Sequence, residues 1–105
     1  MYHPEAEREV LALPTGEYAA MRNALEKLVL FGDRLGFPHT SQVKGARSLR
    51  ELRPRAGRSP WRAFYRRVGD RIVIGSIGPE AHVDTAAFRR ALRVAEERID
   101  AVERE

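Results

Sequence analysis

The sequence of 105 residues contains no cysteine. Disulfides and metal sites with thiolate ligands are therefore excluded, which fits a reducing compartment such as the cytoplasm. No apolar run approaches the roughly 18 residues that a membrane span needs, and the first residues lack the apolar core of a secretion signal. These absences predict a cytoplasmic protein with no membrane contact, organised as one domain over residues 1–105 with a modest core.

Lysine is also scarce, since 17 of the 19 basic residues are arginine. An arginine side chain can grip a phosphate with two hydrogen bonds and can stack on a base. A GC-rich genome would produce the same composition, however, so the ratio alone does not assign a function.

The distribution of charge is more informative than the total of +4. Between residues 44 and 71 there are ten basic and two acidic residues, so this segment carries +8 and the rest of the chain −4. A cationic centre between acidic flanks suggests a polyanion partner, although a solvated basic surface would show the same pattern.

Helical patterns occupy both ends of the chain. Apolar residues at helical spacing predict a short helix from His3-Pro4 to Pro14 and a second helix from the N-cap residue Thr15 to Gly32. Asp84 is the predicted N-cap of a final helix with one apolar side. The first two helices are joined so tightly that they should form an antiparallel hairpin.

Three strands are predicted between these helices, at about 48–54, 60–67 and 71–77, and Gly69-Asp70 marks a tight turn between the last two. The predicted fold class is α+β. It has an amino-terminal helical hairpin packed on a small antiparallel three-stranded sheet, with room for a fourth short strand, and a long carboxy-terminal helix.

The second predicted strand carries charge at positions that are usually apolar. Alternation divides it into two faces, with Trp61, Ala63 and Tyr65 on one and Arg62, Phe64 and Arg66 on the other. If the helical hairpin covers the first face, Arg62 and Phe64 face outward beside Arg53. Because a charge in mid-strand is costly unless it is solvated or paired, we interpret the second face as a shallow cationic groove that binds a ligand.

The segment from Gly32 to Gly78 resembles the core of RelE/ParE-superfamily toxins, in the HigB-like branch. Residues 32–38, GDRLGFP, match the G-x-x-L-G-x-P segment of that branch. Lys44 then precedes an E-L-R strand at residues 51–53, and residues 61–65, WRAFY, match an aromatic-Arg-x-x-Tyr strand. The predicted first helix is similar as well, so the likeness covers most of the chain.

The resemblance implies the toxin of a type II toxin–antitoxin pair. Such toxins are typically endoribonucleases that cut mRNA on the ribosome without a metal or other cofactor. The 2′-hydroxyl attacks the adjacent phosphate, so the protein must activate the hydroxyl, stabilise the charged phosphorane and protonate the leaving oxygen. The implied partners are a cognate antitoxin, mRNA and the ribosome, and both a homo-oligomer and a toxin–antitoxin hetero-oligomer are open.

Carried over by position, the catalytic candidates are Lys44, Arg53 and Arg62. Many family members have a basic stretch after the third strand, whereas this chain has Gly78-Pro79-Glu80-Ala81-His82. Either His82 supplies the general acid or base, or catalysis is weak or absent. The RNA-binding candidates are Arg47, Arg50, Arg55, Arg58, Phe64, Arg66 and Arg67.

Two other functions remain open at this stage. A degenerate relative could bind RNA, DNA or the antitoxin without cleavage, and the missing basic stretch favours this alternative. A ParE-like inhibitor of DNA gyrase would need protein contacts and no phosphodiester site, and the Arg53/Arg62 pair disfavours it. The first strand of the family is nearly missing, because only Met1 and Tyr2 precede the predicted first helix. Either the sheet has an uncovered edge, or the start site lies upstream.

Overall fold

The computed structural model describes residues 1–46 and 48–105 of the protein. Arg47, one of the RNA-binding candidates, lies outside the described residues. Within them, the elements in chain order are α1 (Pro4–Leu11), α2 (Thr15–Phe31), the 3-10 turn η1 (Gly32–Arg34), β1 (Thr40–Gln42), β2 (Arg50–Leu52), the 3-10 turn η2 (Pro54–Gly57), β3 (Trp61–Val68), β4 (Arg71–Pro79) and α3 (Thr85–Glu103).

The four strands form one antiparallel sheet in the order β1-β2-β3-β4. Each strand therefore pairs with its neighbour in sequence, as connections of this length favour. The predicted α+β fold class is confirmed, and β1 is the fourth short strand. On β3, Ala63 lies opposite Leu52 of β2 and Ile77 of β4.

Local capping chemistry sets where the helices begin and end. The Nδ1 atom of His3 accepts a hydrogen bond from the amide of Glu5, and Asp84 Oδ1 accepts one from the amide of Ala87. Gly32 ends α2 with a φ of +53°, a conformation that residues with a side chain rarely adopt. The cap of α2 is Pro14, one residue before the predicted Thr15.

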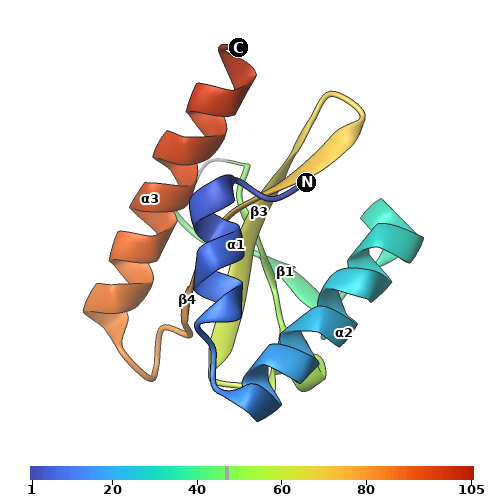
Figure 1. Ribbon diagram of the computed structural model, residues 1–105, viewed down its shortest axis with the longest axis vertical. Coiled ribbons are helices and arrows are strands. Elements are labelled where there is room, and N and C mark those ends of the chain that lie inside the picture. The colour runs from blue at the N-terminus through green and yellow to red at the C-terminus, as the bar shows by residue number, and fades with distance from the viewer. Residues whose placement is uncertain (47) are drawn as a thin grey trace.

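One face of the sheet is covered by α1 and α2, as the sequence predicts (Figure 1). Its buried core joins residues of both helices to alternate residues of the strands: Ala6, Val10, Leu13, Met21, Leu25, Leu28, Leu52, Ala63, Tyr65 and Ile74. Trp61 packs at the margin of this core. Alternate residues of the strands point toward the helices, and the apolar sides of α1 and α2 point toward the sheet. The two sets of apolar side chains therefore pack together.

The opposite face is covered by α3, which Figure 1 shows on the other side of the strands from α2. Phe64 is 0% exposed, and its ring meets Phe88 of α3 edge-on at a centroid distance of 5.5 Å. The helix approaches so closely that a Cβ on Gly78 would lie 2.5 Å from that of Ala91. The expectation that Arg62 and Phe64 face outward on a helix-free surface is therefore wrong. The apolar side of α3 needs a partner, and it packs on the sheet face that the hairpin leaves open.

The β4 edge is less open than the sequence suggests. Tyr2 forms a parallel bridge with Ile74, whose amide donates to the Met1 carbonyl and whose carbonyl accepts from the His3 amide. Further along, the Glu9 carboxylate accepts a hydrogen bond from the Ile77 amide, and Arg98 donates to the Gly75 carbonyl. The β4 edge is thus covered by the extended residues Met1 and Tyr2 and by the side chains of Glu9 and Arg98. No helix among the described residues is long and apolar enough to cross a membrane.

Candidate functional site

The sheet brings Arg53 and Arg62 together around the carboxylate of Glu51. Arg53 Nη1 lies 3.2 Å from Glu51 Oε1, and Arg62 Nε lies 3.7 Å from the same oxygen. The latter distance is too long for a hydrogen bond, so it is a charge contact. Ser41 Oγ of β1 lies 3.1 Å from this oxygen and completes the set. Glu51 thus pairs with two neighbouring arginines at once.

Arg62 is almost completely buried, with its side chain 2% exposed. Its guanidinium donates to the Glu80 carboxylate at 2.8 Å and to the Ser59 carbonyl at 2.7 Å. Further bonds reach the Trp61 and Gly57 carbonyls. A buried charge must be paired and hydrogen-bonded to be tolerated, and this one has both kinds of partner.

Burial also acts on the acid–base balance of this side chain. Desolvation lowers the pKa of the Arg62 guanidinium, the nearby Glu51 carboxylate raises it, and the positive charge of Arg53 lowers it again. An arginine stays charged in spite of such shifts because its ordinary pKa lies far above neutral pH. Arg62 is therefore a fixed cation inside the protein.

Arg53 is held by different contacts and remains more accessible, with 21% of its side chain exposed. Its Nε donates to the Pro38 carbonyl at 3.0 Å, and its guanidinium lies over the Phe37 ring at 5.2 Å from the centroid. Gly57 closes the other side, because a Cβ there would lie 2.5 Å from Arg53 Nη2. These neighbours fix the orientation of the guanidinium.

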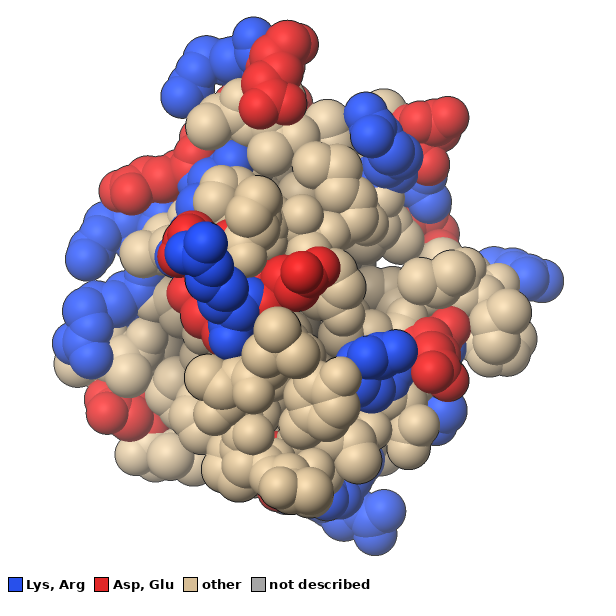
Figure 2. All heavy atoms as spheres, in the orientation of Figure 1, with Lys and Arg blue, Asp and Glu red and all other residues tan. Residues whose placement is uncertain are grey.

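The charges of this cluster cancel. Arg53 and Arg62 contribute +2, and Glu51 and Glu80 contribute −2. The expected open cationic groove is therefore absent from this part of the sheet, since a carboxylate already occupies each arginine. On the face that Figure 2 displays, basic and acidic side chains are interleaved.

Residues 8–77 match the family model described as phage-derived protein Gp49-like (DUF891). The chain belongs to this family. It is a RelE/HigB-type toxin family of toxin–antitoxin systems, which supports the superfamily resemblance but leaves the HigB-like branch as a prediction. No curated protein matches the chain.

In this Gp49-like chain, Lys44 lies far from the arginine cluster. It is exposed in the turn beyond the end of β1, whereas the Arg53 amide donates to the carbonyl of His39, just before β1. Five residues along a strand correspond to roughly 16 Å. The structure thus places Lys44 at the opposite end of the β1–β2 pair, so it does not bring this catalytic candidate together with Arg53 and Arg62.

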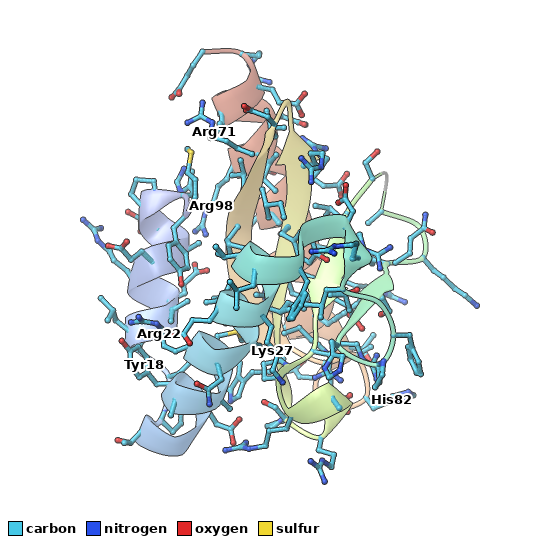
Figure 3. The ribbon with its side chains drawn as sticks, turned by 90° about the vertical axis from the view of Figure 1, so that its right-hand side faces the viewer. Tyr18, Arg22, Lys27, Arg71, His82 and Arg98 are labelled. Carbon is cyan, nitrogen blue, oxygen red and sulfur yellow. The ribbon has the colours of Figure 1, made fainter. Side chains whose placement is uncertain are left out.

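His82 lies at the same end of the sheet as the cluster, two residues after Glu80 in the turn between β4 and α3. Its side chain is exposed, and Figure 3 shows it at the outer rim of the molecule. The site of the Gp49-like chain that the structure assembles is therefore Arg53 and Arg62, with Glu51 between them and the 80–82 segment beside them.

The RNA-binding candidates do not form one surface. Arg50 donates to the Thr40 hydroxyl, Arg55 pairs with Glu17, and Arg67 pairs with Asp33. Arg66 is 8% exposed and binds carboxylates of α3, while Phe64 is fully buried. Arg58 is exposed and directly follows η2. The packing of α3 buries the two members that were expected to face outward.

Sequence reasoning missed the carboxylates that neutralise β3. Asp100 and Glu103 of α3 bind Arg66, and Glu80 binds Arg62. The sequence held one signal for them. The predicted last helix has an apolar side that must pack against another part of the fold, and Asp100 and Glu103 are next to the apolar residues Ile99 and Val102 of that side. Glu80 stands where many family members have a basic stretch, and this is visible in the sequence. Its partner Arg62 is not, because the pair forms only when β4 lies against β3.

Proposed function

We propose that the protein is the toxin of a type II toxin–antitoxin pair and cleaves mRNA during translation as a metal-independent endoribonuclease. The observation that carries this proposal is the convergence of Arg53 and Arg62 on one carboxylate oxygen, at 3.2 Å and 3.7 Å. Two guanidinium groups held around one anionic oxygen suit the non-bridging oxygens of a phosphate.

In the proposed reaction, the 2′-oxygen of a nucleotide forms a bond to the adjacent phosphorus and the bond from phosphorus to the 5′-oxygen breaks. The products are a 2′,3′-cyclic phosphate and a free 5′-hydroxyl. Arg53 is the more exposed arginine and contacts the phosphorane, while the buried Arg62 adds positive charge from inside the protein. His82 is the proposed proton donor or acceptor at this end of the sheet.

The accessible arginine offers the sharpest test of this function. Arg53→Ala should abolish growth arrest and lower mRNA cleavage by about 10² to 10³, because one stabilising donor is lost. Arg53→Lys should restore little, since an ammonium cannot reproduce the two-pronged grip. Growth curves and transcript mapping measure both effects, and Arg104→Ala at the distal end of α3 is the control. Full toxicity of Arg53→Ala would overturn the assignment.

A second candidate function is a module that binds without cleavage, and the Arg62–Glu80 pair favours it because a carboxylate already neutralises this arginine. The Glu80→Gln variant distinguishes the endoribonuclease from the binding module. If the purified variant cleaves RNA faster than the wild type, Glu80 restrains an active site. If neither cleaves RNA and neither arrests growth at equal protein levels, the binding module stands.

Growth arrest with intact transcripts and damaged DNA would support gyrase inhibition instead. The antitoxin partner that the family implies can be tested in the same strains. Exposed cations on α3 at Arg89, Arg90 and Arg93 suit an acidic segment of that partner. Charge reversal at these residues should weaken co-purification at low salt, and unchanged co-purification would place the partner elsewhere.

A further inference from the structure

A pocket of about 340 Å³ lies between α2, the η2 segment and the chain entering β1. It is separate from the carboxylate cluster described above, because Glu51, Arg62 and Glu80 do not line it. Arg53 belongs to both and connects them.

Small side chains on one side of α2 create the space. Gly16, Ala19, Ala20 and Ala24 form one wall, and Ala56 of η2 faces them. Arg55 and Ala56 both have a φ of +55°, a left-handed conformation that is unfavourable for residues with a side chain. Arg55 holds this turn in place, since it donates to the Gly16 carbonyl and to the Glu17 carboxylate.

The polar groups of the pocket are cationic or neutral. Lys27 and Asn23 extend from α2, and His39 stands at the far end. His39 is fixed at both ends of its backbone, because its amide donates to the Gly36 carbonyl and its carbonyl accepts from the Arg53 amide. Figure 3 shows Lys27 on the side of α2 opposite Tyr18 and Arg22, which lie toward α1.

No carboxylate lines this pocket, whereas four further pockets each include an aspartate or glutamate beside their arginines. In the part of the chain that the structure describes, Lys27 forms no ion pair with an acidic residue. The pocket therefore combines unneutralised positive charge with apolar walls formed by Leu35, Leu52 and the α2 alanines.

We infer that this pocket binds one nucleotide unit, with its phosphate at Lys27 and His39 and its base against the alanine wall. The volume is within the range of small-ligand sites. The lining offers basic and amide groups for a phosphate and an apolar wall for a base. An ammonium and an imidazole can both donate to phosphate oxygens. The nucleotide is either a free nucleoside monophosphate or one unit of an RNA strand that continues from Arg53.

The test is a titration of the full chain with adenosine 5′-monophosphate, followed by amide chemical shifts. We expect saturable shifts in residues 16–27 and around His39. Lys27→Gln should weaken binding about tenfold, because a charge-assisted hydrogen bond is lost. Ala19→Leu, an exposed wall position where leucine is a good helix former, should abolish binding by filling the space.

Arg104→Gln is the control, since it removes an exposed positive charge at the end of α3, on the other face of the sheet. Adenosine without phosphate should bind much more weakly. A 2′-O-methylated tetranucleotide without terminal phosphates distinguishes the sources, because it binds as tightly as the monophosphate only if the site takes an internal phosphodiester.

Absence of saturable shifts, or equal affinities of the wild type, Lys27→Gln and Ala19→Leu, would overturn the inference. These measurements record binding alone and do not depend on the proposed cleavage. A protein that binds the monophosphate but never cuts RNA would refute the proposed function and leave this pocket assigned.

Discussion

The two faces of the sheet are covered in different ways although the same strand contributes to both. On the α1–α2 face, β3 presents Ala63 and Tyr65 to an apolar core. On the α3 face, the same strand presents Phe64 between two arginines that are 2% and 8% exposed, Arg62 and Arg66. The first face is held by burial of apolar surface, and the second combines apolar packing with buried ion pairs.

This difference shows that an arginine in mid-strand does not mark an exposed surface. Arg66 pairs with two carboxylates of α3, and Arg62 pairs with Glu51 and Glu80 and donates to backbone carbonyls. Among the described residues, the Nε atom of each arginine is nevertheless buried without a hydrogen-bond partner. Buried ion pairs contribute little net stability, because desolvation offsets most of the attraction. Removal of one partner, however, leaves a buried charge unpaired and lowers the free energy of unfolding. The largest losses of stability are therefore expected on the α3 face.

The strongest test of the α3 face removes its central ring. Phe64→Ala should lower the free energy of unfolding by about 3–5 kcal/mol, because it leaves a cavity beneath Phe88. Urea unfolding followed by circular dichroism measures the change. Leu30→Ala, at a position that is 71% exposed, should change it by less than about 0.5 kcal/mol. A loss below 1 kcal/mol for Phe64→Ala would mean that α3 does not pack there.

The ion-pair contribution is tested at Arg62. Arg62→Ala should cost about 3 kcal/mol, since it leaves the Glu80 carboxylate without its partner and opens a cavity. Arg62→Met, which keeps most of the volume, should lose less, and adding Glu80→Gln should recover part of that loss. Thermal and urea unfolding of the three variants give the comparison. Equal stability of Arg62→Ala and the wild type would show that the side chain is not buried.

The closeness of α3 to β4 is tested by adding one methyl group. Gly78→Ala places a Cβ 2.5 Å from that of Ala91, so the helix must shift and stability should fall by about 1–3 kcal/mol. Gly36→Ala is the matched control, because no atom within 4 Å would meet the new Cβ. If the two substitutions have the same effect in urea unfolding, α3 is not held against β4 at this point.

The smallest expected effect lies on the other side, where Glu17 joins α2 to the η2 segment. Hydrogen bonds from Ser59 and then Arg55 lower the pKa of the Glu17 carboxyl. A carboxyl whose pKa is lower in the folded state stabilises the fold above its unfolded pKa, and this contribution disappears as the pH falls through the folded pKa.

Glu17→Gln should therefore reduce stability at neutral pH by no more than about 1 kcal/mol and flatten its decline in acid. Melting temperatures between pH 7 and pH 3 measure both. An unchanged acid slope would show that this carboxyl does not contribute to the decline.

The sequence by itself determined the three helices, three of the four strands and one of the two faces. Capping residues such as Asp84 and Gly32 act over three or four residues, and strand alternation acts over two, so these signals are local and readable. The resemblance added the pairing of Arg53 with Arg62, and the structure brings both to Glu51. The pocket beside Lys27 had no sequence signal, because it depends on how η2 closes over α2.

Only the tertiary structure decided what covers the second face. The apolar side of α3 is evident in the sequence, but a helix of this kind can pack on its own sheet or on a partner. Arg66 meets Asp100 and Glu103 across 34 and 37 residues, distances at which periodicity carries no information. Whether β3 exposes a cationic groove or buries paired arginines therefore depended on where α3 packs, since burial requires the partners that only that packing supplies.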